Sequence, residues 1–171
     1  NPAPDFSGVI GRSRGVAEKM SKGIQFLMKK NKIDVIMGTA KLLSPTKIEV
    51  TAADNSKKVI EAKNIILATG GRARQLPSMP IDGKKIIGYR EAMTLPKQPK
   101  SMIICGSGAI GAEFAYFYNS MGTKVTIVEF LPRIVPVEDE EISKELDKHF
   151  KKSGIDIMVN SEVTSVDTSG A

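Results

Sequence analysis

One stretch of the sequence combines glycines at fixed spacing with a single acid, and such residues could hold a ligand that carries phosphates. A short apolar run at 102–105 leads towards a helix-like segment at 112–121 and a β-branched run at 125–128. Glu129 closes the stretch, 18 residues after the last glycine. Between the first run and the helix-like segment lies the pattern G-x-G-x-x-G, formed by Gly106, Ser107, Gly108, Ala109, Ile110 and Gly111.

Each part of this pattern has a physical role in holding a pyrophosphate. Gly106 permits a tight turn, Gly108 lets the backbone approach the phosphates, and Gly111 lets the helix pack closely on the strand. The free N–H groups at the helix N-terminus then face the phosphates. Glu129 can accept hydrogen bonds from a ribose 2′-OH and would repel a 2′-phosphate, which favours NAD over NADP. The alternative is a glycine-rich turn in another α/β unit, but the strand, helix and acid around the motif favour a dinucleotide site.

The elements that must position these residues are indicated by periodicity. A second helix is predicted at 139–152, followed by strands at 155–159 and 162–166. The order strand–helix–strand–helix–strand between 101 and 159 is typical of a doubly wound, Rossmann-like α/β unit. The second helix is predicted to bury an apolar stripe of Ile142, Leu146 and Phe150.

The first hundred residues predict a different arrangement. Residues 1–13 are rich in Pro and Gly and are expected to form a loop, whereas 14–30 have helical spacing with one buried face. Gly23 within this helix suggests close packing against a neighbour. Short strands, including a small β-meander, are predicted at 33–37, 40–43, 47–52, 58–62 and 63–69.

The run from 63 to 69 is mostly apolar and is typical of a strand buried on both faces. It leads into Gly70 and Gly71, which either leave room for a ligand against the backbone or form an ordinary strand-to-loop turn. Four prolines between 72 and 100 indicate an irregular crossover. We therefore expect two domains, at 1–96 and 97–171.

Composition excludes several classes of protein. The chain has 171 residues, of which 41% are hydrophobic, and no apolar run approaches the length of a membrane span. No signal peptide is recognisable, and the single cysteine, Cys105, excludes an internal disulfide framework and fits a reducing, cytoplasmic compartment. Cys105 itself is expected to be a small core residue.

The net charge of +6 is unevenly distributed along the chain. Residues 1–100 carry a strong positive excess and 101–171 a negative one, a pattern that could indicate nucleic-acid binding. A solvated basic face is the simpler interpretation, because no aromatic residues are interleaved with the lysines at 29–32. We therefore expect no nucleic-acid partner.

Three stretches resemble the flavin-dependent pyridine nucleotide–disulfide oxidoreductases. The segment 106–113 with 128–130 resembles the family's NAD unit, and Ile66-Leu67-Ala68-Thr69-Gly70-Gly71 resembles its second FAD-contacting segment. Residues 31–40 resemble the strand and turn whose backbone touches the FAD adenine. The likeness covers nearly the whole chain, and it implies a C-terminal part of an FAD-binding domain followed by an NAD-binding domain.

The resemblance also implies roles for individual residues. The three motif glycines would hold the NAD pyrophosphate, and Glu129 the adenosine ribose. Ala109 would shield the flavin until nicotinamide enters, and Glu113 would help to place the nicotinamide. Thr69, with Gly70 and Gly71, would lie along FAD, and Ala40 near its adenine. Arg133, close to the acid, is the residue type that NADP-using relatives place in this region.

Within the family, the likeness is to the enzymes that oxidise protein-bound dihydrolipoamide with NAD⁺ through a redox disulfide and a flavin. The implied partner is the lipoyl domain of a 2-oxo acid dehydrogenase complex, and the implied parent protein is a homodimer. Other disulfide reductases, such as mercuric reductase, and a non-enzymatic NAD-binding sensor stay open as alternatives.

Several features of the family are not in the sequence. It contains no second G-x-G-x-x-G, no C-x4-C pair and no C-terminal His/Glu pair. His149 is expected to be an exposed helix residue without a catalytic role. Because the sequence also starts at Asn1 without Met, we expect a central fragment that is inactive alone, and that is monomeric if the dimer contacts lie in the C-terminal domain.

Overall fold

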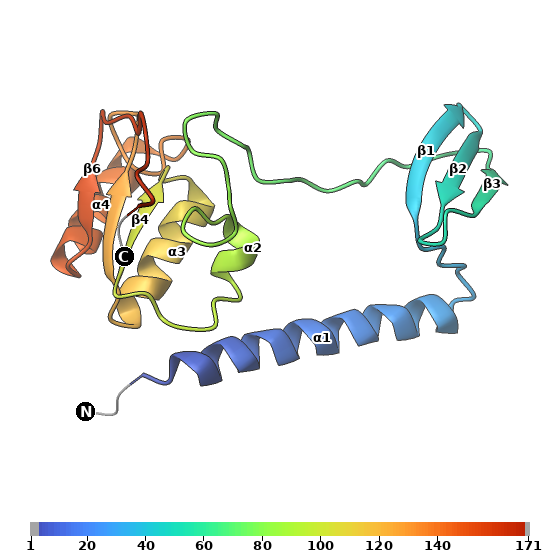
Figure 1. The fold of residues 1–171 in the computed structure, drawn as a ribbon, viewed down its shortest axis with the longest axis horizontal. Coiled ribbons are helices and arrows are strands. Elements are labelled where there is room, and N and C mark those ends of the chain that lie inside the picture. Colours follow the sequence, from blue (N-terminus) through green and yellow to red (C-terminus); the bar gives the residue numbers. More distant parts are fainter. Residues whose placement is uncertain (1–3, 170–171) are drawn as a thin grey trace. The chain divides into compact units, whose positions relative to one another are not determined.

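A computed structural model describes residues 4–169, which divide into two compact units (Figure 1). The larger unit contains the residues up to Arg14 together with those from Ala73 onward, and the smaller unit is Gly15–Arg72. Each unit has its own three-stranded sheet. Within the described residues, no helix combines the length and the apolar character that crossing a bilayer requires.

The larger unit is built on a parallel sheet in the order β4-β5-β6, with β4 at Ser101–Cys105, β5 at Lys124–Val128 and β6 at Asp156–Met158. Helix α3 (Ala109–Ser120) connects the first two strands and α4 (Glu140–Lys152) the last two. The predicted order of alternating strands and helices, and with it the α/β class, is confirmed. Because the strands are parallel, their carboxyl ends meet at one edge of the sheet, where the glycine-rich motif follows β4.

The core of the larger unit lies between the sheet and α3. Val125 and Ile127 of β5 and Tyr118 of α3 are fully buried. The Tyr118 hydroxyl donates to the carbonyl of Ala92, at the end of the short helix α2 (Tyr89–Ala92). Phe6 packs against Tyr118, with the ring centroids 6.0 Å apart. The connection 72–100 is therefore anchored to α3 through a buried tyrosine.

Helix α4 begins at an effective cap and buries two of the three residues of the predicted stripe. The Asp139 carboxylate accepts a hydrogen bond from the N–H of Glu141 at 2.8 Å. Phe150 is buried and Leu146 packs against the core, both as predicted, whereas Ile142 is 62% exposed. Ser143 takes the buried place instead, and its hydroxyl donates to the carbonyl of Val135. The stripe thus differs from the predicted one only at its first position, where a hydrogen-bonded serine fits against the neighbouring loop.

Helix α1 (Phe6–Lys30) begins eight residues before the predicted start. The side chain of Asp5 accepts a hydrogen bond from the N–H of Gly8 at 2.9 Å, and this cap allows a glycine-containing segment to be helical. The expected loop is therefore wrong from residue 6 onward. The apolar face of α1 is also exposed, as shown by Met20 at 68%, and nothing in the structure approaches a Cβ added at Gly23.

The smaller unit contains an antiparallel meander of β1 (Thr39–Ser44), β2 (Lys47–Thr51) and β3 (Lys57–Glu61). These three strands confirm the prediction. The other strands predicted outside the meander and the parallel sheet do not form: residues 33–37, 63–69 and 162–166 have no regular structure.

The segment 63–69 shows why these strands are missing. Ile66 is 91% exposed and Leu67 is 67% exposed, so the predicted burial on both faces is wrong for the described residues. An apolar run forms a buried strand only if neighbouring strands pair with its N–H and C=O groups. Within residues 4–169, no strand pairs with this segment.

Candidate dinucleotide-binding site

The glycine-rich loop turns sharply between β4 and α3. Gly106 has φ +94°, a left-handed conformation that glycine adopts without steric cost. Its N–H donates to the carbonyl of Val128 at 2.8 Å, which ties the loop to the end of β5. The turn thus has the geometry expected of the first glycine of the motif.

The other two glycines differ in what surrounds them. A Cβ added at Gly111 would lie 2.1 Å from the carbonyl oxygen of Gly106, so close packing of the helix on the turn requires glycine. A Cβ added at Gly108 would meet nothing within 4 Å. The space in front of Gly108 is therefore open to a ligand.

We expect Gly111→Ala to destabilise the protein by about 1–3 kcal/mol, the usual cost of forcing an extra methyl into a packed site. The new methyl must displace either the Gly106 carbonyl or the first turn of α3. Thermal unfolding checks this, with Gly108→Ala as the matched control because its added methyl meets no atom. Equal melting temperatures for the two variants would contradict the proposed contact.

The N-terminus of α3 presents four backbone donors. The N–H groups of Gly108, Ala109, Ile110 and Gly111 take part in none of the hydrogen bonds found among residues 4–169, and the first helical bond runs from Ala112 N–H to the Gly108 carbonyl. No acidic side chain lies in the first turn of this helix. Free N–H groups and the positive end of the helix dipole suit an anion, so these residues fit a pyrophosphate.

Glu129 stands at the end of β5 and is joined to the glycine-rich loop. It is only 6% exposed. Its Oε2 accepts hydrogen bonds from the N–H and the hydroxyl of Ser107, at 2.7 and 2.6 Å, and its Oε1 accepts one from the N–H of Leu131 at 2.8 Å. The structure therefore brings together the acid and the loop, two parts that the sequence predicted to share one site.

The hydrogen bonds also set the charge of this acid. Burial acts to raise the pKa of the Glu129 carboxyl, but the bonds from Ser107 and from the N–H groups of Leu131 and Phe130 outweigh it and hold the pKa below its ordinary value. The group is therefore a carboxylate at neutral pH. A carboxylate accepts hydrogen bonds from ribose hydroxyls and repels a phosphate.

The residues expected near the nicotinamide lie on α3. Ala109 is in the first turn and Glu113 is one turn later, so both lie on the same side of the helix. Both are exposed. The side chain of Glu113 has no hydrogen bond or ion pair to another residue within 4–169, and its carboxylate is accordingly accessible to a ligand.

The residues expected along FAD lie in the smaller unit. Ala40 is in β1, opposite Val50, and is exposed. Thr69, Gly70 and Gly71 are exposed and without regular structure, and Gly70 has φ +71°. Among the described residues, no hydrogen bond joins Ala40 to this glycine-containing segment. The structure leaves these four residues accessible but does not assemble them into one site.

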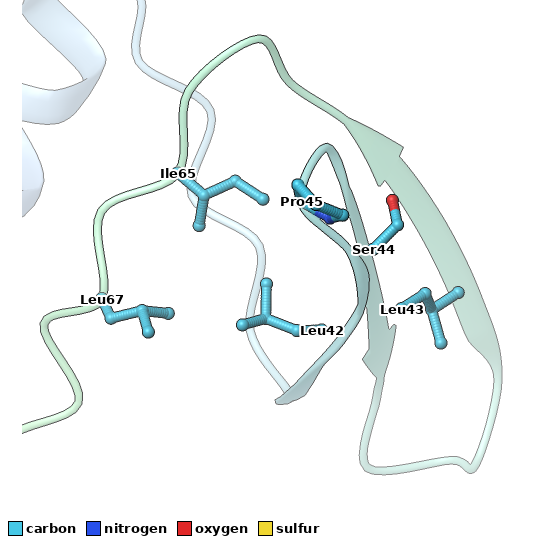
Figure 2. A pocket seen from close by; sticks show the side chains of 6 residues that line it. All are labelled: Leu42, Leu43, Ser44, Pro45, Ile65 and Leu67. Atoms are coloured by element: carbon cyan, nitrogen blue, oxygen red, sulfur yellow. The ribbon is translucent and has the colours of Figure 1, made fainter.

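An apolar hollow of about 470 Å³ lies next to these residues in sequence (Figure 2). Its lining contains no charged side chain, and it therefore suits apolar groups rather than phosphates. Figure 2 shows Ile65 and Leu67 on the chain segment that faces the first hairpin of the meander. The hollow is lined by Leu42, Leu43, Ser44, Pro45, Ile65 and Leu67.

Two residues depart from what the sequence indicated. Cys105 is exposed rather than a core residue, and its thiol lies 3.6 Å from the sulfur of Met79. The prediction was wrong because β4 is an edge strand in this sheet. Ser107 was included only as part of the motif, yet its side chain binds Glu129 directly. A hydroxyl beside the motif glycines was the one available signal for this contact.

Comparison with known proteins extends over nearly the whole chain. Residues 2–171 match the family model described as pyridine nucleotide-disulphide oxidoreductase. A dihydrolipoyl dehydrogenase of Rhizobium etli is 47% identical, over 96% of this chain and 37% of its own length. The crystal structure of LpdA from Mycobacterium tuberculosis matches with a TM-score of 0.91 at 31% identity, over 99% of this chain and 38% of LpdA.

A second solved structure is similar to a lesser degree. The HOCl-induced flavoprotein disulfide reductase RclA of Escherichia coli has a TM-score of 0.82 at 28% identity. This match covers 95% of the chain and 37% of RclA. The chain thus spans little more than a third of the proteins it matches. On the strength of the family model and of the site it contains, the chain belongs to the pyridine nucleotide-disulphide oxidoreductase family.

Proposed function

We propose that this chain is the central part of a dihydrolipoyl dehydrogenase that oxidises protein-bound dihydrolipoamide with NAD⁺. The family and its dihydrolipoyl dehydrogenases use FAD and NAD. The observation that carries the proposal is the pairing of four free backbone N–H groups at α3 with the buried carboxylate of Glu129. Residues 1–96 would belong to the FAD-binding domain and 97–171 to the NAD-binding domain.

In this proposal the chain's own residues bind and orient the dinucleotide. The N–H groups at the start of α3 hold the pyrophosphate, and Glu129 accepts a hydrogen bond from the adenosine ribose. Ala109, at the start of the same helix, and Glu113, one turn later, would meet the nicotinamide end. When bound, the flavin and the nicotinamide carry the electrons from the dithiol to NAD⁺ by way of a redox disulfide.

The FAD site is proposed from the accessibility of its residues rather than from contacts between them. Thr69, Gly70 and Gly71 would follow the flavin nucleotide, and Ala40 would lie near its adenine. Added Cβ atoms at Gly70 and Gly71 meet nothing within 4 Å, so the backbone there is accessible to a large ligand. The apolar hollow, whose lining includes Ile65 and Leu67 from the preceding residues, suits packing against apolar groups rather than against phosphates.

The 171-residue chain alone is expected not to turn over dihydrolipoamide. Its single cysteine cannot form a redox disulfide within the chain, and its single histidine, His149, is exposed on α4 with Nε2 3.2 Å from the Glu145 carboxylate. Dihydrolipoamide-dependent reduction of NAD⁺, followed at the absorbance of NADH, checks this. The control is the intact protein in the same assay, and turnover by the chain alone would overturn the assignment.

The function itself is tested by nucleotide binding and by substrate. The intact protein should bind NADH more tightly than NADPH in a fluorescence titration and should reduce NAD⁺ with dihydrolipoamide. A protein that binds neither nucleotide would contradict the dinucleotide site. A protein that binds NADH but carries no flavin would instead be a sensor module.

A second candidate is a disulfide reductase that acts on another substrate. The structural similarity to RclA, a flavoprotein disulfide reductase, favours keeping it. Both candidates use the same nucleotide sites, so only the substrate separates them. Activity with a different disulfide or metal substrate, and none with dihydrolipoamide, would select this alternative.

The proposed partners and location follow from the first candidate. A dihydrolipoyl dehydrogenase acts on the lipoyl domain of a 2-oxo acid dehydrogenase complex, and we propose that the intact protein is a homodimer. A cytoplasmic location agrees with the single unpaired cysteine. Co-purification with a lipoyl domain and the mass of the intact protein in solution test these two partners.

A further inference from the structure

Ser107 contributes both of its donors to one atom of Glu129. Its N–H and its hydroxyl reach the same carboxylate oxygen, Oε2, and Ser107 is fully buried. The carbonyl of Ser107 accepts a hydrogen bond from the N–H of Val135 at 2.9 Å. The residue is thus held from both sides, between the strand end that carries the acid and the loop that follows it.

We propose that Ser107 is a positioning residue for nucleotide selection, and that its hydroxyl holds the Glu129 carboxylate in the orientation that accepts the ribose of NAD and rejects the 2′-phosphate of NADP. This inference rests on the proposed NAD site. Ser107 acts through Glu129 and is not itself assigned a contact with the ribose.

The number of acceptor positions supports this role. A carboxylate offers about four lone-pair positions, two on each oxygen. Ser107 occupies both positions on Oε2, and the N–H of Leu131 occupies one on Oε1. Oε1 is therefore the less occupied oxygen, and the ribose hydroxyl would bind there. The hydroxyl of Ser107 therefore decides which oxygen of the acid meets the nucleotide.

The hydroxyl of Ser107 also stabilises the negative charge of the Glu129 carboxylate. A buried carboxylate is unfavourable unless hydrogen bonds compensate for the loss of water. Hydrogen bonds to a charged group are stronger than those between neutral groups. Removing the hydroxyl would leave Oε2 with one donor instead of two, and the side chain would be free to turn away from the ribose and from a 2′-phosphate.

The test is the ratio of the dissociation constants of NADPH and NADH, measured on the intact protein. We expect Ser107→Ala to lower this ratio about tenfold, the size of effect expected from losing one hydrogen bond to a charged group. Ser107→Thr, which keeps the hydroxyl, should retain the ratio to within about twofold of the original. A loosened loop would weaken both nucleotides equally and leave the ratio unchanged.

A double-mutant cycle shows whether Ser107 acts through the acid. In a Glu129→Gln background, Ser107→Ala should produce no further change in the ratio. An unchanged ratio in the single variant, or an equal change in both backgrounds, would overturn the inference. If Ser107→Ala does not fold, Ser107→Gly removes the same hydroxyl without adding an atom and is judged by the same ratio.

The outcome distinguishes this inference from the proposed function. The NAD site itself is contradicted if the unsubstituted protein prefers NADPH. It is also contradicted if Glu129→Ala leaves the ratio of the two dissociation constants unchanged. A protein that prefers NADH and responds to Glu129→Ala, but not to loss of the Ser107 hydroxyl, contradicts only the role of Ser107.

Discussion

Replacing Glu129 with alanine is expected to remove most of the preference for NADH over NADPH. The variant loses the carboxylate that would bind the ribose, and NADH affinity should fall about tenfold, as for the loss of a hydrogen bond to a charged group. Affinity for NADPH should stay the same or rise, because the repulsion of the 2′-phosphate is removed at the same time. Fluorescence titrations of the intact protein with both nucleotides measure the ratio.

Glu129→Gln is the matched variant, because it keeps the size of the side chain and removes only its charge. It should also lower the ratio of the NADPH and NADH dissociation constants. Unlike alanine, it keeps a side-chain oxygen that can accept a hydrogen bond from Leu131 or Ser107. Since the pKa of Glu129 lies below its ordinary value of 4.5, the acid stays ionised between about pH 6 and pH 8, and the affinity for NADH should not vary over that range. If neither substitution changes the ratio of the NADPH and NADH dissociation constants, Glu129 is not part of the nucleotide site.

The second large effect is expected from Gly108→Val, which should abolish NADH binding without harming the fold. Gly108 has φ −61° and ψ 176°, an extended conformation open to any residue, and its added Cβ meets nothing within 4 Å. The valine side chain would instead fill the space that the pyrophosphate needs. Losing two hydrogen bonds from backbone N–H groups to a charged phosphate would weaken binding at least about 100-fold.

The control for this variant is Gly11→Val, another position where an added Cβ meets no atom, but outside the glycine-rich loop. Both variants should keep a melting temperature close to that of the original protein, and only Gly108→Val should lose NADH. If Gly108→Val binds NADH normally, the ligand does not approach the loop at this point. If it unfolds, the open space in front of Gly108 is not as the structure describes it.

The larger unit was predictable because its signals are local. The glycine spacing of the motif, the β-branched run of β5 and the Asp139 cap each lie within one element or one turn. The positions of Glu129 and of the loop then follow from parallel pairing, which brings the carboxyl ends of β4 and β5 together. The arrangement of the candidate nucleotide site could therefore be predicted from the sequence.

The missing strands have a different cause, since a strand depends on partners far away in the chain. The apolar runs at 33–37 and 63–69 have the composition of strands, but a strand requires an adjacent edge, and composition does not reveal whether one exists. The exposure of Cys105 has the same origin, because an apolar strand predicts burial only when it lies inside a sheet. In α4 the buried stripe differs from the prediction only at its first position, where Ser143 donates a hydrogen bond to Val135.

The contact between Ser107 and Glu129 shows what a motif alone leaves out. The two residues are 22 positions apart, and the motif is written with an unspecified residue at the serine. Only the structure shows that the Ser107 hydroxyl donates to Oε2 of Glu129. Sequence patterns thus locate the candidate nucleotide site, whereas the orientation of its acid depends on a tertiary contact.

The position of β4 at one side of its sheet has a consequence for handling the chain. It pairs only with β5 in the described residues, and Ile103 is 69% exposed on it. In a doubly wound sheet the first strand normally lies in the centre, between two neighbours. An unpaired apolar strand is a template for edge-to-edge association. A preparation of the 171 residues that precipitates at high concentration would therefore reflect this uncovered backbone rather than a misfolded nucleotide site.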